Sequence, residues 1–262
     1  MPSSALHVAR TGLEAQDTRM RVISNNLANI GTTGFKRDRA NFSTLTYQDA
    51  RVAGQQSSSE TAYATGLNLG TGVGIQSTTS ITTQGTLSTT GNSLDLALDG
   101  EGYFQIQLPG GKLGYTRAGN FTRSAEGQLV TSQGYAVQPP ITIPEGASAI
   151  TIANDGTVSV TISGQSEPTQ LGQITIAAFT NPAGLQALGD NFLGETAASG
   201  AAQIGVAGDA GRGQIRQGML EASNVNVVEE LVDMIECQRA YEINSKMISA
   251  VDEMLKNANQ TL

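Results

Sequence analysis

Apolar side chains at both ends of the chain repeat with alternating three- and four-residue spacing, which is typical of helices that wind around a partner helix. Near the N-terminus the repeat comprises Leu6, Ala9, Leu13, Gln16, Met20, Ile23, Leu27 and Ile30. Near the C-terminus it comprises Val227, Leu231, Met234, Gln238, Tyr241, Ser245, Ile248, Asp252 and Leu255. The spacing predicts two long terminal helices that pair as a coiled coil, with the larger apolar members driving helix–helix assembly.

The two helices are expected over residues 1–30 and 225–262. Gly31 fits the left-handed conformation that ends many helices. Asn226, followed by Glu229 three residues later, resembles the capping box that begins a helix.

The C-terminal helix carries a second apolar face, which one partner helix cannot cover. This face consists of Val228, Val232, Ile235, Ile243, Met247, Val251 and Met254. In a monomer it would be exposed to water, whereas packing of helix pairs into a tube would bury it. The pattern indicates a subunit of an assembly, whose terminal helices become ordered only when neighbours cover them.

Short stretches between the helices alternate apolar and polar side chains and are bounded by Gly or Pro, as in antiparallel strands with one buried face. They are residues 86–89, 94–98, 103–108, 141–143, 150–152, 158–162 and 174–176. The predicted fold is α+β, with a central antiparallel β domain over 71–204. Connectors are expected over 31–70 and 205–224.

The first connector contains a polar segment, residues 47–66, with few large aliphatic side chains. It includes Gln55, Gln56, Ser57 and Ser58. One interpretation is a disordered loop. The other is a long hairpin that is ordered only by neighbouring subunits, because it cannot bury enough surface alone.

Composition excludes several classes of protein. The net charge of −8 argues against binding to nucleic-acid phosphates. No apolar run approaches the ~20 residues that span a membrane, so no membrane insertion is expected. The N-terminus lacks the basic and apolar regions of a cleaved signal peptide. The single cysteine excludes an internal disulfide.

The chain is poor in catalytic side chains, so we expect neither an enzyme nor a cofactor. Its only histidine is His7, at the start of a helix, and its only cysteine is Cys237, in the middle of one. One His and one Cys cannot form an ordinary transition-metal site. The glycines of residues 70–74 indicate a turn or bulge, since the segment that follows is strand-like rather than helical.

Asparagines cluster where the predicted helices end and begin. They are Asn25, Asn26, Asn29, Asn224 and Asn226. Two interpretations remain open: helix capping, or hydrogen bonds between helices that fix their register. Gln16 and Gln238, which occupy seam positions, are the better candidates for fixing register.

Five stretches of the sequence resemble one family. Residues 25–36, with Asn25, Asn26, Leu27, Ala28, Asn29, Gly34 and Phe35, resemble the N-terminal signature of the bacterial flagellar rod and hook axial proteins. Residues 223–232, with Asn224, Val225 and Asn226, and residues 238–246, with Arg239, Ala240 and Tyr241, resemble the C-terminal signature. Residues 99–104 and 115–121 are similar to shared segments of the family's β domain. The resemblance covers essentially the whole chain.

The resemblance implies a structural subunit that polymerises into a stiff helical tube. Such a tube would carry torque from the motor to the hook and enclose the axial export channel. Implied partners are further copies of the chain, proximal rod proteins, the hook protein, the rod cap and the P- and L-ring proteins. The implied location is the periplasm-spanning rod of the basal body, reached through the flagellar type III export apparatus without a cleaved signal peptide.

Within the family, the length and the polar 47–66 segment are most similar to the distal-rod branch, and this segment is expected to stiffen the shaft. The proximal-rod branch remains an alternative. From another class, a glycan-binding β module is the competing hypothesis, although the β region has few aromatic side chains for stacking on sugars.

Overall fold

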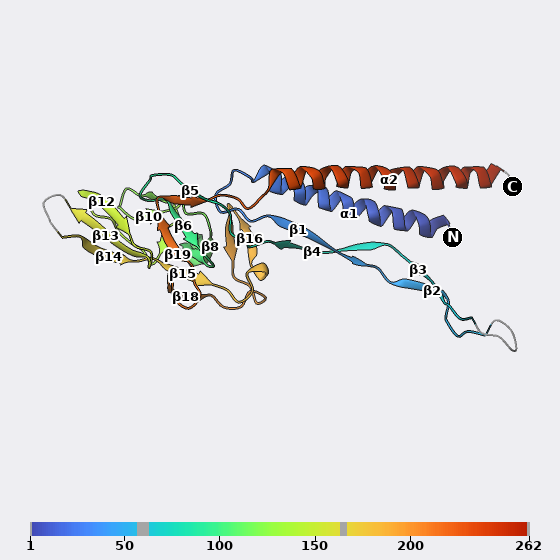
Figure 1. Cartoon of the computed structure of the whole chain (residues 1–262), viewed down its shortest axis with the longest axis horizontal. Coiled ribbons are helices and arrows are strands. Elements are labelled where there is room, and N and C mark those ends of the chain that lie inside the picture. The colour runs from blue at the N-terminus through green and yellow to red at the C-terminus, as the bar shows by residue number, and fades with distance from the viewer. Residues whose placement is uncertain (1, 57–62, 163–166, 261–262) are drawn as a thin grey trace. The chain divides into compact units, whose positions relative to one another are not determined.

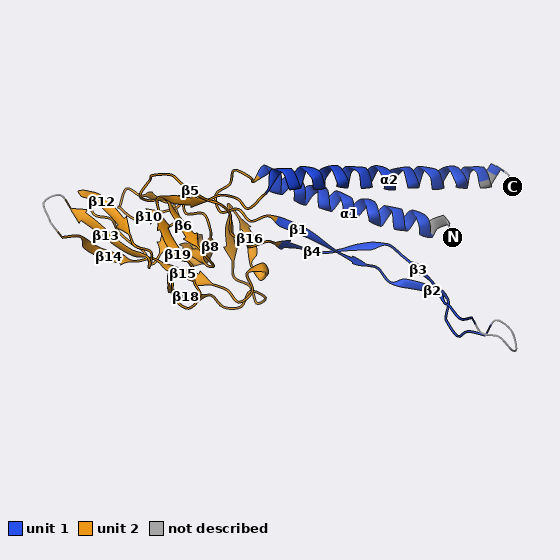
Figure 2. Cartoon of the chain, in the orientation of Figure 1, with its two compact units in different colours: residues 1–28, 38–79, 226–262 blue, residues 29–37, 80–225 orange. Residues whose placement is uncertain are grey.

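The computed structural model describes residues 2–56, 63–162 and 167–260. The chain divides into two compact units (Figure 2). Unit 1 contains residues 1–28, 38–79 and 226–262, and unit 2 contains residues 29–37 and 80–225. The observed architecture is α+β, with a helix near each terminus and antiparallel strands between them, as predicted. The coiled-coil winding of the two helices stays a prediction.

Unit 1 contains both long helices, α1 (Pro2–Ala28) and α2 (Val227–Gln260), which lie side by side (Figure 1). Asn226 caps α2, since its side-chain oxygen accepts the backbone N–H of Val228 at 3.1 Å. Glu229 and Glu230 in the first turn lie where the helix dipole favours anions.

The prediction that Gly31 adopts the left-handed conformation was wrong. The left-handed glycine is Gly34, with φ of 68°. After α1 the chain first makes two tight turns, in which Thr32 N–H donates to Asn29 O and Phe35 N–H donates to Thr32 O. The left-handed backbone conformation that favours glycine therefore occurs at Gly34, three residues after the predicted position at Gly31.

Unit 1 also contains two short two-stranded ribbons (Figure 1). One pairs β1 (Asp38–Thr44) with β4 (Val73–Ser80). The other pairs β2 (Tyr47–Arg51) antiparallel with β3 (Leu67–Gly70). Within the glycine-rich residues 70–74, Thr71 and Gly72 separate β3 from β4, and Gly72 has φ of 124°.

The main sheet of unit 2 is antiparallel. Its strand order is β16 (Gln186–Gly189), β17 (Phe192–Gly194), β8 (Leu113–Thr116), β7 (Tyr103–Gln107), β15 (Thr175–Ala178) and β18 (Gln203–Val206), and β11 (Val137–Gln138) also pairs with β7. Short 3₁₀ turns at Pro109–Gly111 and Pro182–Gly184 lie in its connections.

Smaller sheets complete unit 2. A three-stranded sheet joins β12 (Ala147–Ile152), β13 (Thr157–Ile162) and β14 (Thr169–Gln173). Strand pairs are formed by β5 (Leu87–Thr89) with β20 (Met219–Glu221), β6 (Leu96–Asp99) with β19 (Gln214–Gln217), and β9 (Thr122–Arg123) with β10 (Leu129–Val130). The last strands of unit 2 thus pair with its first ones.

The apolar core of unit 2 lies between these sheets. Its buried members include Leu96, Leu98, Phe104, Phe121, Ile174, Ile176 and Ile215. The strand predicted at residues 141–143 is absent, because only Thr142 makes an isolated bridge, to Gln128. Pro139, Pro140 and Pro144 flank it and lack the N–H groups that a ladder needs, although Ile141 and Ile143 still point into the core.

Candidate assembly surfaces and a buried ionic cluster

The predicted seam residues differ in how far α1 and α2 cover them. Ile23 is buried, and Leu6, Leu13, Met20 and Leu27 on α1 and Met234, Ile248 and Leu255 on α2 are half-buried. Val227, Leu231 and Tyr241 remain exposed in the single chain. Among the side chains of α2 that the structure describes, Glu230 and Cys237, seven residues apart, are fully buried. The face of α2 that meets α1 is therefore rotated from the predicted one.

Small side chains bring the two helices close together. Ala9 and Ala15 are buried on α1. A Cβ atom at Gly12 would lie 3.0 Å from the amide nitrogen of Asn244 on α2. The Cys237 thiol donates to the backbone oxygen of Gln16 at 3.0 Å, and its burial raises the pKa of the thiol. This geometry fits an inert, packed cysteine.

Asn26 makes polar contacts with two other segments of unit 1. Its amide nitrogen donates to both carboxylate oxygens of Glu230, at 3.3 and 3.2 Å, and to Asp38 O at 2.9 Å. Its amide oxygen accepts Asp38 N–H at 2.9 Å. Because Asn26 and Glu230 are buried on different helices, this contact can fix the register of α1 against α2.

Both interpretations of the asparagines therefore occur, at different positions. Asn26 connects helices, whereas Asn226 caps one. Gln238, which we expected to fix register, is exposed. Arg19 adds an ion pair to Asp233 across the helices at 2.8 Å.

An exposed apolar stripe follows the outer side of α2. It consists of Val228, Val232, Ile235, Ile243, Met247 and Met254, each with 49–69% of its surface accessible. Val251, the remaining member of the predicted second face, is half-buried. With 3.6 residues per turn, the stripe lies away from the line through Glu230 and Cys237 that meets α1.

The polar segment after β2 is exposed as far as it is described, except at Tyr63, which is half-buried. Gln55 and Gln56 are exposed, and Ser57 and Ser58 lie outside the described residues. Gly54 N–H donates to Tyr63 O at 2.8 Å, and Tyr63 N–H donates to Gln55 O at 3.0 Å. The two sides of the segment thus stay paired beyond the β2–β3 ladder.

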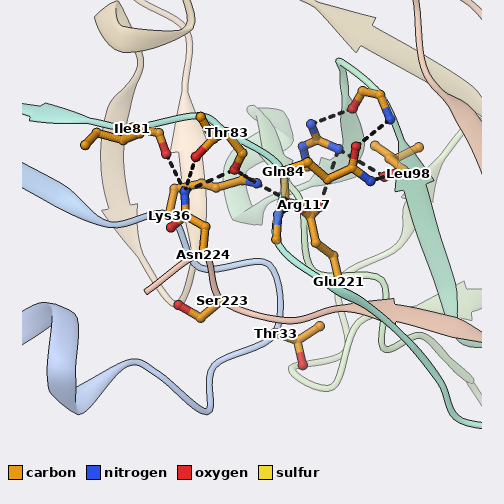
Figure 3. Close-up of polar contacts among 12 residues, drawn as sticks. Thr33, Lys36, Ile81, Thr83, Gln84, Leu98, Arg117, Glu221, Ser223 and Asn224 are labelled. Atoms are coloured by element: carbon orange, nitrogen blue, oxygen red, sulfur yellow. Dashed lines mark hydrogen bonds and ion pairs between the residues drawn. The ribbon is translucent and has the colours of Figure 1, made fainter. Parts of the chain in front are cut away.

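Gly34 and Asn224, two residues of the resembling motifs, have clear structural roles in unit 2. A Cβ atom at Gly34 would lie 2.6 Å from the backbone carbon of Arg117. The Asn224 side chain accepts Arg37 N–H at 2.8 Å and donates to Ile81 O and Thr83 O at 2.8 and 3.0 Å. Asn224 therefore ties together three chain segments that are distant in sequence (Figure 3).

Next to Asn224 lies a buried ionic cluster of Lys36, Arg117 and Glu221 (Figure 3). Their side chains are 8%, 6% and 0% exposed. Lys36 Nζ lies 2.5 Å from Glu221 Oε1, and Arg117 Nη1 lies 3.4 Å from Glu221 Oε2. Burial lowers the pKa of Lys36, and the hydrogen bond to Glu221 opposes that shift.

Backbone groups add hydrogen bonds to this cluster, although Arg117 Nε and Glu221 Oε2 are buried without a hydrogen-bond partner. Lys36 Nζ donates to Thr83 O at 2.8 Å, and Gly85 N–H donates to Glu221 Oε1 at 2.9 Å. Arg117 donates to Gly100 O at 2.7 Å. The sequence interpretation did not single out this cluster, although Lys36 and Arg117 both lie inside the motifs that resemble the family.

Neither the helices nor the cluster has the arrangement of a catalytic site. His7 is exposed on α1. Among the described residues, no group of His, Cys, Asp and Glu could hold a metal ion, and neither helix is long and apolar enough to cross a membrane. What the arrangement offers is surface for packing and a buried set of charges that joins distant segments.

Three family models match the chain. "Flagella basal body rod protein" matches residues 6–36, "Flagellar hook protein FlgE/F/G D1 domain" matches residues 97–160, and "Flagellar basal body rod FlgEFG protein C-terminal" matches residues 216–261. These regions contain the motifs at both ends of the chain and much of the β region.

Curated relatives match over almost their full length. The flagellar basal-body rod protein FlgG of Buchnera aphidicola subsp. Acyrthosiphon pisum is 51% identical, with 98% of each chain covered. That of Caulobacter vibrioides is 50% identical, again with 98% of each chain covered. The rod protein FlgF of Caulobacter vibrioides is 34% identical, with 99% of this chain and 98% of its own covered.

Proposed function

Because the chain belongs to the FlgG family of flagellar basal-body rod proteins, and is thus a structural subunit of that rod, we propose that it polymerises into a stiff helical tube, the distal rod. This tube carries torque from the motor to the hook and encloses the axial export channel. The lower identity to the FlgF relative, 34% against 51%, favours the distal rod over the proximal-rod paralogue.

The observation that carries this proposal is the exposed apolar stripe of α2. Six large side chains in a row along one helix are costly to leave in water, at ~25 cal/mol for each Å² of apolar surface. A second copy of the chain in a helical polymer would cover them. Contacts of this kind are heterologous, so each subunit can bind one neighbour on each side and extend the tube.

We assign the helix pair to the inner tube, where α1 and α2 wind as a coiled coil. In this assignment the β region is the outer domain. Val227, Leu231 and Tyr241, which α1 leaves exposed, belong to contacts between subunits. Ile23, Leu27, Met234 and Ile248 belong to the contact within the pair.

The proposal extends to partners and location. Further copies of the chain, proximal rod proteins, the hook protein, the rod cap and the P- and L-ring proteins would surround or continue the shaft. The chain would reach the periplasm-spanning rod through the flagellar type III apparatus, without a cleaved signal peptide. An unfolded chain that needs no disulfide suits such a route.

A matched pair of substitutions on α2 tests the proposal. Ile243→Asp places a charge in the apolar stripe, whereas Ser249→Asp adds the same charge at an exposed position outside it. We expect Ile243→Asp to abolish polymerisation, because an unpaired charge in a packed interface costs several kcal/mol. That cost is comparable to the whole binding free energy of a weak contact between two subunits.

Sedimentation velocity over a concentration series measures the effect, and circular dichroism checks that both variants remain folded. Ser249→Asp should polymerise like the unaltered chain. Normal polymerisation of Ile243→Asp would show that the stripe is not the contact between subunits.

A further inference from the structure

The first and last parts of unit 2 meet at the ionic cluster. Lys36 lies at the start of the unit and Glu221 near its end, 185 residues later. The backbone follows the same pattern, since Gly34 N–H donates to Glu221 O at 2.8 Å and Asn224 N–H donates to Phe35 O at 3.4 Å. Residues 32–37 therefore have part of their final hydrogen bonding only when residues 221–224 are in place.

The same late segment completes the sheets of unit 2. Strands β19 and β20, residues 214–221, pair with β6 and β5. Ile215 on β19 and Leu96 and Leu98 on β6 are fully buried in the core. Until β19 arrives, one side of β6 lacks its ladder partner and the core lacks a side chain.

Electrostatics makes Glu221 the critical member of this segment. Lys36 and Arg117 share one carboxylate as their ion-pair partner in this cluster, that of Glu221. Without this carboxylate, burial of the two cations side by side would be strongly unfavourable. The free energy cost of burying an unpaired charge is much larger than the net stabilisation from a buried ion pair. The cluster can therefore close only with Glu221 present.

We propose that Glu221 forms a closing contact, so that unit 2 reaches its final fold only after residues 214–224 have joined segments made much earlier in the chain. In a chain that emerges N-terminus first, almost all of unit 2 would wait in an incomplete state. Residue 227, where α2 begins, follows at once, so completion of unit 2 would coincide with the arrival of the second helix.

The order of emergence rests on the export route proposed above, whereas the closing contact is a property of the folding monomer. Refolding of the dilute, full-length protein therefore tests it without polymerisation or export. Pulsed hydrogen-exchange labelling with mass spectrometry would follow the main sheet (103–116) and the closing segments (32–37 and 214–224) separately. We expect the main sheet to gain protection first and both closing segments to gain it together, later.

A pair of variants separates the closing contact from an ordinary ion pair. Glu221→Gln removes the buried carboxylate, whereas Asp99→Asn removes a half-exposed one, which pairs with Arg216 across β6 and β19 at 3.1 Å. If the contact forms late, Glu221→Gln should raise the unfolding rate at least about tenfold and change the refolding rate less than about twofold. Asp99→Asn should change neither rate by more than about twofold.

Protection of residues 214–224 as early as the main sheet in the unaltered protein would overturn the proposal. So would an unfolding rate of Glu221→Gln equal to that of Asp99→Asn. If Glu221→Gln does not fold, the labelling order of the unaltered protein decides alone.

Discussion

At the scale of single residues, the chain uses glycine and buried polar side chains where its segments approach most closely. Gly34 and Asn26 both lie in the N-terminal motif, and the structure gives each a specific reason. Gly34 has a left-handed backbone against Arg117, and Asn26 connects α1 to Glu230 and Asp38. The motif is thus explained by close contacts between distant segments rather than by helix capping alone.

Gly34 and Gly31 form a natural pair for measurement. A Cβ atom at Gly34 would clash with backbone, whereas one at Gly31 would meet nothing within 4 Å. We predict that Gly34→Ala lowers the free energy of unfolding by about 2 kcal/mol or more, from strain and displacement of Arg117. Gly31→Ala should change it by less than about 0.5 kcal/mol. Urea denaturation followed by circular dichroism measures both, and equal effects would contradict this account.

Sequence reasoning could not find the ionic cluster, for a physical reason. Periodicity reports local structure, but Lys36, Arg117 and Glu221 come together only in the tertiary fold. Lys36 and Glu221 are 185 residues apart in the sequence. Each looks like an ordinary surface charge in the sequence. The left-handed glycine was misplaced in a similar way, since its position depends on Arg117 and Glu221 rather than on the end of α1.

At the scale of elements, periodicity predicted both helices and most strands. The fully covered line of α2 through Glu230 and Cys237 is rotated from the predicted seam, although Met234, Ile248 and Leu255 of that seam are half-buried. An apolar repeat does not identify a seam that contains a carboxylate and a thiol, Glu230 and Cys237. Two apolar faces on one helix are also ambiguous, because the pattern alone does not say which face meets the partner helix and which meets another subunit.

The helix pair itself buries few large side chains. Of its described side chains, the fully buried hydrophobic ones are Ala9, Ala15, Ile23 and Cys237. Helices in proteins gain most of their stability from packing against other elements. We therefore expect the two helices to separate in the dilute monomer and to pack together in the polymer.

Cys237 reports this opening. Its thiol is buried and its raised pKa keeps it protonated near neutral pH, so it should be alkylated only when the helices separate. We predict that iodoacetamide at pH 8 modifies the dilute monomer within about tenfold of the rate in urea, and the polymer at least about a hundredfold more slowly. Equally strong protection of the dilute monomer would show that the pair is stable alone.

At the scale of the whole molecule, the polar 47–66 segment is the feature without a core of its own. Its described residues are exposed apart from the half-buried Tyr63, and they stay hydrogen-bonded across the ribbon. We propose that Gln55, Gln56, Ser57 and Ser58 form hydrogen bonds to neighbouring subunits. Each such bond contributes about 1 kcal/mol, but it is repeated at every subunit of the tube.

Deletion of residues 47–64 tests this role. The deleted chain should fold and polymerise, because the apolar stripe and the helix pair are untouched, but its filaments should bend more easily and become curved. Curvature and bending stiffness measured on images of both filaments decide the matter. Filaments as straight and stiff as those of the full chain would leave the segment without a mechanical role.

The central claim is that this chain is a rod subunit that builds a straight tube through its helices. Electron microscopy of the purified full-length protein at rising concentration tests it most directly. The account predicts straight tubes with a central channel, in which α1 and α2 form the inner wall and the apolar stripe is buried between subunits. Monomers or shapeless aggregates at every concentration, or tubes with the β region on the inside, would contradict it.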